Sequence, residues 1–130
     1  MKRLQSLIPK ALKAIDDKIK NTTDGKVASE MNGYISSFGA SLINAGLLPT
    51  IIFFSQKGGS SGGREKLIPA IEQILNTSDN PPINLLDEVK TIYSAQSIDQ
   101  SKINRLTEKI TDAALVLKLA LRTFPTDKKK

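Results

Sequence analysis

Apolar residues recur along most of this chain at steps of three and four positions, the spacing that places side chains on one face of a helix. The longest such stripe ends just before Pro125, and Asp99 precedes it in the position of an N-cap. We therefore expect a long final helix. Its apolar stripe consists of Ile103, Leu106, Ile110, Ala113, Leu117, Ala120 and Phe124.

A second stripe covers the first twenty residues, but Pro9 interrupts it. Proline removes a backbone hydrogen bond and is tolerated in the first turn of a helix. We therefore expect the main helix of this segment to begin between Ser6 and Pro9. Its apolar face comprises Leu4, Ile8, Ala11, Ile15 and Ile19.

The central segment predicts two helices separated by Gly46, a residue type that commonly terminates helices. The stripe before this glycine runs from Met31 to Ala45. Residues 50–54 are β-branched or aromatic, so a strand competes with a helix here. We favour a helix because Pro49 suits a first turn and a lone strand would have no partner.

Two more helical segments follow, over residues 64–75 and 83–96. The whole chain is thus predicted to be all-α, a single-domain bundle of five or six helices over residues 1–130. Residues 57–63 have the Gly/Ser composition of a flexible loop, and residues 125–130 form a basic C-terminal tail.

Composition narrows the function. The 130 residues include no Cys and no His, which excludes disulfides, zinc fingers and every imidazole- or thiol-based mechanism. Neither a secretory signal nor an apolar run of about 20 residues is present, so we expect a cytoplasmic protein. We also expect no enzymatic activity, no metal and no other cofactor.

Two motifs have some features of a phosphate-binding or carboxylate site but lack the residues or the geometry that such a site requires. The glycines of residues 58–63 have the spacing of a phosphate-binding loop, yet Arg64-Glu65 follows where Lys and then Ser or Thr are required. The acid pairs Asp16-Asp17 and Asp87-Glu88 point about 100° apart on a helix, so neither pair converges on one metal or substrate. A flexible linker and solvated helix surfaces explain these residues better.

The net charge of +6 is concentrated at the two ends of the chain. One interpretation is a solvated surface balanced by nearby acids; the other is a phosphate-binding surface. Aromatic residues make up only 5% of the chain, which disfavours a base-stacking platform and favours binding without sequence recognition. The candidate RNA-binding stripes are Lys10, Lys13 and Lys20 in the first helix, and Lys102, Arg105 and Lys109 in the last.

Residues 38–57 resemble the small-subunit family of the type III-B CRISPR (Cmr) RNA-targeting complex. The shared pattern is a helix ending in a polar residue, a small or polar residue, then Gly-Leu, a short apolar run with an aromatic, and a lysine a few residues later. Residues 113–124 resemble the family's Ala/Leu-rich last helix. The Gly/Ser loop after the lysine and the absence of an aromatic at 119–121 depart from the family pattern. The motif residues are Asn44, Gly46, Leu47, Phe53 and Lys57.

This resemblance implies a non-catalytic, all-α protein whose copies stack head to tail and line the path of guide RNA and target RNA. It implies as partners the other Cmr subunits, both the backbone RAMP-type subunits and the large subunit. Lys57, at the end of the motif, and Arg64, beyond the loop, join the candidate RNA-binding residues. Lys57 could instead cap the C-terminus of the third helix. The alternative function is a free-standing helical adaptor that binds a protein through an apolar groove.

Overall fold

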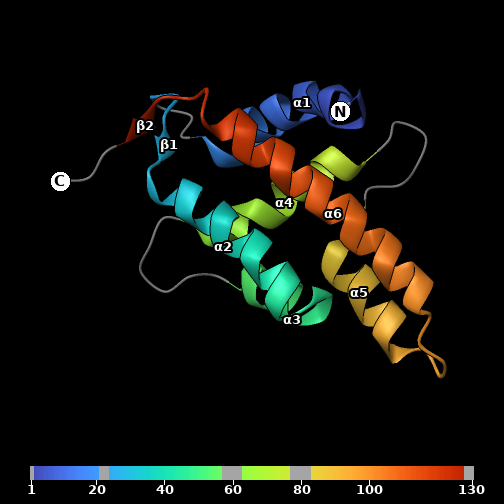
Figure 1. Ribbon diagram of the computed structural model, residues 1–130. Helices are drawn as coiled ribbons and strands as arrows, with labels where there is room; N and C mark the ends of the chain where they lie inside the picture. Colours follow the sequence, from blue (N-terminus) through green and yellow to red (C-terminus); the bar gives the residue numbers. More distant parts are fainter. Residues whose placement is uncertain (1, 21–23, 57–62, 77–82, 128–130) are drawn as a thin grey trace.

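The computed structural model describes residues 2–20, 24–56, 63–76 and 83–127. Within these residues the chain folds into an α-helical bundle, which confirms the predicted all-α class (Figure 1). None of the described helices is long and apolar enough to cross a membrane. The helices are α1 (Lys2–Ala14), α2 (Glu30–Asn44), α3 (Leu47–Ser55), α4 (Leu67–Leu75), α5 (Leu85–Ser94) and α6 (Gln100–Leu121).

The long helix α6 organises the bundle, because it packs against α1, α2 and α4 (Figure 1). Six of its seven predicted stripe residues are buried, and Phe124, beyond the helix end, is partly buried. The Asp99 side chain accepts hydrogen bonds from the backbone N–H groups of Ser101 (3.0 Å) and Lys102 (3.3 Å). The predicted N-cap and core face of this helix are therefore both confirmed.

Helix α1 begins at Lys2 and continues through Pro9, so the expected start between Ser6 and Pro9 is wrong. Burial of Leu4 in the core holds the first turn in place. The carbonyl deprived of its donor by the proline belongs to Gln5, which is exposed, so water can replace the lost bond. Local propensity is overridden here because the tertiary contact outweighs one missing hydrogen bond.

The first helical segment ends in a π-helical turn, η1 (Ile15–Ile19), closed by the Lys20 N–H donating to the Ile15 carbonyl at 2.9 Å. A π turn contains more residues than an α turn, so side chains four apart stay closer to one face. Ile15 and Ile19 are accordingly both buried. The sequence predicted their burial but not the wider turn.

Helices α2 and α3 meet at a corner built around Gly46, which has φ +94° and ψ 178°. The Ser41 carbonyl accepts from the N–H groups of both Ala45 and Gly46. Across the corner, the Ser41 and buried Thr50 hydroxyls lie 2.6 Å apart. Residues 50–54 are helical, as predicted, and the aromatic pair Phe38–Phe54 joins α2 to α3 at 5.1 Å between ring centroids.

Two short strands were not predicted. β1 (Val27–Ala28) pairs in parallel with β2 (Thr126–Asp127), and the Val27 N–H donates to the Pro125 carbonyl at 2.9 Å. The expectation of a tail from residue 125 is therefore corrected for residues 125–127, which close against the segment before α2 (Figure 1). Two residues per strand are too few for a sequence pattern. Residues 128–130 lie outside the described part.

The predicted helix over residues 64–75 consists of a short 3₁₀ turn, η2 (Arg64–Lys66), followed by α4. Glu72 of α4 ties this helix to the next: its Oε2 accepts the N–H of buried Leu85, the first residue of α5, at 2.7 Å. Burial raises the pKa of the Glu72 carboxyl, and the hydrogen bond from Leu85 opposes that rise.

Removing this tie should destabilise the fold. We expect Glu72→Ala to lower the free energy of unfolding by about 1–2 kcal/mol, because the Leu85 N–H loses its acceptor. Glu72→Gln is the matched control, since an amide oxygen can still accept that bond. A raised pKa means that the folded state binds the proton more tightly, so this group contributes less stability as the pH rises above its ordinary value of 4.5.

Chemical denaturation of both variants between pH 4 and pH 8 measures these effects. The Gln variant should lack the part of the pH dependence that Glu72 contributes. Equal stability of the Ala variant and the parent would show that water satisfies the Leu85 N–H.

Candidate nucleic-acid interface

The three basic residues predicted on the last helix lie together on the N-terminal half of α6. Lys102, Arg105 and Lys109 are all exposed and line one groove of about 290 Å³. Their spacing of three and four residues places them along one side of the helix. The rest of the groove comes from α4, α5, the residues just before α5, and α6 itself. These lining residues are Leu75, Ile83, Glu88, Ile92 and Leu106.

The charge of this groove is not neutralised within the described part of the chain. There, the side chains of Lys102, Arg105 and Lys109 form no ion pair with another described residue. Glu88 is the one carboxylate among the lining residues, so three positive charges face one negative charge. We refer to this feature, with its eight lining residues, as the α6 groove.

The first turn of α6 contributes one basic side chain, Lys102, to the groove. Backbone N–H groups give a helix N-terminus a partial positive charge, which favours acidic side chains. The first turn of α6 contains no acid, and Lys102 occupies its third position. The Asp99 carboxylate at the N-cap offsets this partial positive charge, so the positive potential of the groove comes from its three basic side chains.

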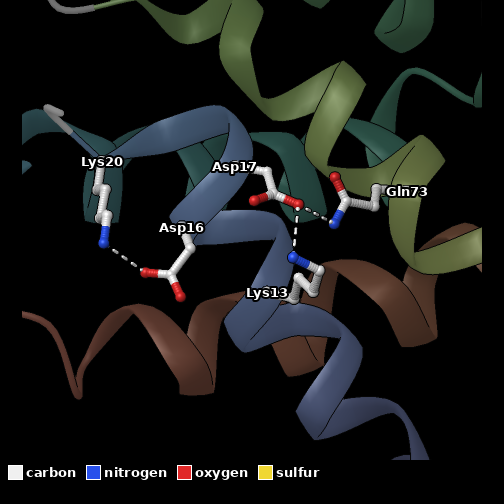
Figure 2. A network of polar contacts seen from close by, with 5 residues as sticks. All are labelled: Lys13, Asp16, Asp17, Lys20 and Gln73. Atoms are coloured by element: carbon white, nitrogen blue, oxygen red, sulfur yellow. Dashed lines mark hydrogen bonds and ion pairs between the residues drawn. The ribbon is translucent and has the colours of Figure 1, made fainter.

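The basic residues of the first segment are arranged differently (Figure 2). Lys13 pairs with Asp17 at 3.4 Å, and Lys20 pairs with Asp16 at 2.8 Å. Gln73 of α4 also donates to Asp17 at 3.0 Å, and this bond, with Lys13, holds the pKa of Asp17 below its ordinary value.

Because of these pairs, Lys13 and Lys20 have less charge available to an external phosphate than the basic residues of the α6 groove have. Lys10 is exposed and forms no ion pair with a described residue. The solvated, acid-balanced interpretation therefore fits Lys13 and Lys20 better than it fits Lys10.

Arg64 is engaged within the protein. Its guanidinium carbon lies 4.2 Å from the centroid of the Phe53 ring, a cation–π geometry. Phe53 is half exposed, and the Arg64 Nε is buried without a hydrogen-bond partner among the described residues. Lys57, the remaining predicted candidate, lies outside the described residues.

The sequence pattern predicted the three basic residues of the groove but not the aliphatic residues that line the rest of it. Leu75 and Ile83 precede Lys102 by about 20 residues or more, and nothing in their spacing relates them to α6. Their role depends on how α4 and α5 pack.

A family model described as CRISPR-associated protein (Cas_Cmr5) matches residues 5–119. The chain belongs to this family. It is a small subunit of the type III-B CRISPR Cmr complex, as the resemblance predicted, and other Cmr subunits are its partners. No curated protein matches the chain, and no solved structure does.

An apolar surface lies away from the α6 groove, between α2 and the C-terminal half of α6. It is a hollow of about 300 Å³ whose lining includes Ile43, Leu115 and Lys118. Ile43 is 85% exposed, an unusual degree for a large aliphatic side chain. In a Cmr subunit, such a surface is suited to contact with a protein neighbour.

Proposed function

We propose that this Cmr subunit is non-catalytic and lines the path of guide and target RNA through the α6 groove. The observation that carries the proposal is the cluster of Lys102, Arg105 and Lys109, three exposed bases without ion pairs among the described residues. Phosphate oxygens are the natural counterpart of such a cluster. The proposal gives Lys13 and Lys20 a smaller part, because Asp17 and Asp16 compete for them.

Contacts of this kind are weak and independent of sequence. Each neutralised phosphate releases condensed counterions, so the affinity depends steeply on salt. With about three contacts per subunit we expect the isolated chain to bind single-stranded RNA with micromolar affinity at best. Several copies along one RNA would bind far more tightly, because linked weak sites act at high effective concentration.

Head-to-tail stacking of copies is the second part of the proposal. A head-to-tail contact joins two different surfaces, and each must be able to bury apolar area. The hollow around Ile43 supplies one apolar surface, and Ile52 with Phe53 on α3 supplies another, at 40% and 50% exposure. Sedimentation of the chain over a range of concentrations tests self-association directly.

Copurification with crosslinking tests the RNA contact. Tagged chain, co-expressed with the other Cmr subunits, should retain those subunits and a guide RNA. After irradiation with photoreactive target RNA, we expect crosslinks in the peptide containing residues 102–109, and fewer in the peptide containing residues 10–20.

The apolar end of α6 provides an internal control, because residues 114–121 should remain free of RNA crosslinks. Retention of the subunits with crosslinks confined to other segments would overturn the assignment of the α6 groove. Copurification with unrelated proteins and no RNA would favour the adaptor alternative.

A further inference from the structure

We propose that the α6 groove holds one unstacked base of the RNA strand, with the base on an aliphatic floor and its phosphate on the basic rim. This inference rests on the proposed function, since it requires that RNA reaches the groove. It goes further because it gives the aliphatic floor of the groove a role in binding, which contact with phosphate alone would not require.

The floor is formed by aliphatic side chains from separate elements. Ile92 of α5 and Leu106 of α6 are each 8% exposed, while Leu75 and Ile83 are partly buried. The floor is therefore a continuation of the core that reaches the bottom of an open groove. The flat face of a nucleobase is its least polar surface, and it gains by leaving water for such a floor.

Backbone capping holds the floor in position before any ligand binds. The Ile83 N–H donates to the Asn76 side chain at 2.8 Å, which ties the approach to α5 to the end of α4. The Asn84 side chain then caps α5 by accepting from the Asp87 N–H at 3.0 Å. A groove that is already shaped loses less entropy on binding.

The groove is large enough to receive a small flat group such as a nucleobase. Pockets for small ligands have volumes of roughly 300–1,000 Å³, and the α6 groove, at about 290 Å³, lies just below this range. The described lining contains no aromatic ring, so the base would contact aliphatic groups and not a stacking platform.

The distribution of charge sets the orientation of the nucleotide. The basic side chains stand on α6, and Glu88 stands on α5, the other wall of the groove. A phosphate is attracted to the α6 wall and repelled from the α5 wall. The base, which carries no charge, is the part of the nucleotide that can cross the floor toward Glu88.

A comparison of two RNA ligands of equal charge tests the inference on the intact chain. One is a uridine octamer, and the other is the same ribose-phosphate backbone without bases. We expect the abasic strand to bind about fivefold more weakly at the same salt concentration, the effect of burying roughly 40 Å² of apolar surface. Both strands should show the same salt dependence, because their phosphates are the same.

Two matched variants locate the effect. Ile83→Asn makes the floor polar and should remove the difference between the two strands while leaving the salt dependence intact. Leu86→Asn is the control: it makes the same kind of change on α5, but Leu86 lines a different hollow beside Glu72. The control should retain the fivefold difference.

Methyl NMR of the parent chain gives a readout that needs no variant. The uridine strand should shift the methyl signals of Leu75, Ile83, Ile92 and Leu106, and the abasic strand should not. Equal affinity for both strands, with unmoved floor methyls, would overturn the base site yet leave phosphate binding by the rim intact. Failure of both strands to bind the isolated chain, together with absence of α6 crosslinks in the complex, would instead reject the proposed function.

Discussion

Complexes that carry the triple substitution Lys102→Glu, Arg105→Glu and Lys109→Glu should capture target RNA much more weakly than the parent, and with a flatter salt dependence. For single strands the logarithm of affinity falls with the logarithm of salt with a slope near −0.7 per phosphate contact. Loss of three contacts therefore flattens the slope by about 2 per subunit. At low salt, where such contacts are strongest, we expect affinity to fall at least about tenfold.

The triple substitution should not harm the fold. All three side chains are exposed and form no ion pair with a described residue, and such surface charges contribute little to stability. Lys102→Glu even places an acid in the first turn of α6, where the helix dipole favours it. Thermal unfolding of the triple variant should therefore match the parent closely.

A second triple variant controls for net charge. Lys26→Glu, Lys66→Glu and Lys90→Glu also change exposed bases, and each set of three reversals takes the net charge from +6 to 0. Salt titrations of RNA capture by assembled complexes compare the two. If both triple variants lower the slope equally, the effect comes from overall charge. If neither does, the α6 groove does not contact phosphate, and Lys10 becomes the leading candidate among the described bases.

Substitution of Gly46 should destabilise the fold strongly for a change of one methyl group. We expect Gly46→Ala to lower the free energy of unfolding by about 1–3 kcal/mol, and Gly46→Val by more. At φ +94° and ψ 178° the backbone occupies a region that is essentially restricted to glycine. A Cβ added there would meet no atom within 4 Å, so the cost arises from the backbone conformation and not from a clash.

Gly33→Ala provides the matched control. Gly33 lies within α2, is exposed, has no positive φ, and also has open space around an added Cβ. The same methyl group should therefore stabilise the protein there by about 0.5–1 kcal/mol, because alanine is the better helix former. Denaturant unfolding of both variants measures the contrast. A Gly46→Ala variant as stable as the parent would mean that the corner relaxes to an ordinary conformation without loss.

The sequence by itself determined the elements that depend on neighbours in the chain. The stripe of α6 predicted its buried face, Asp99 predicted its cap, and Gly46 predicted the break between α2 and α3. Each of these signals acts over about one helical turn or one regular period, so one stretch of residues contains it completely. The family was also accessible from the sequence, because its motif lies within residues 38–57.

Tertiary packing decided which basic residues are available. From the sequence, Lys13 and Lys20 were candidates for RNA binding in the same way as Lys102 and Lys109. The structure pairs Lys13 and Lys20 with acids, whereas Lys102 and Lys109 line a groove. Gln73 of α4, 56 residues away, helps to fix Asp17 beside Lys13. Long-range contacts of this kind have no periodic signature in the sequence.

The same reason explains the continuation of α1 through Pro9, the pairing of β1 with β2, and the floor of the α6 groove. Each depends on segments that are distant in the chain and meet only after the helices pack. Leu4 holds the first turn because the core receives it, and Ile83 lies near Lys109 because α4 and α5 place it there. Local patterns determined the helices and their buried faces. The packing of those faces formed the groove and decided which basic side chains line it.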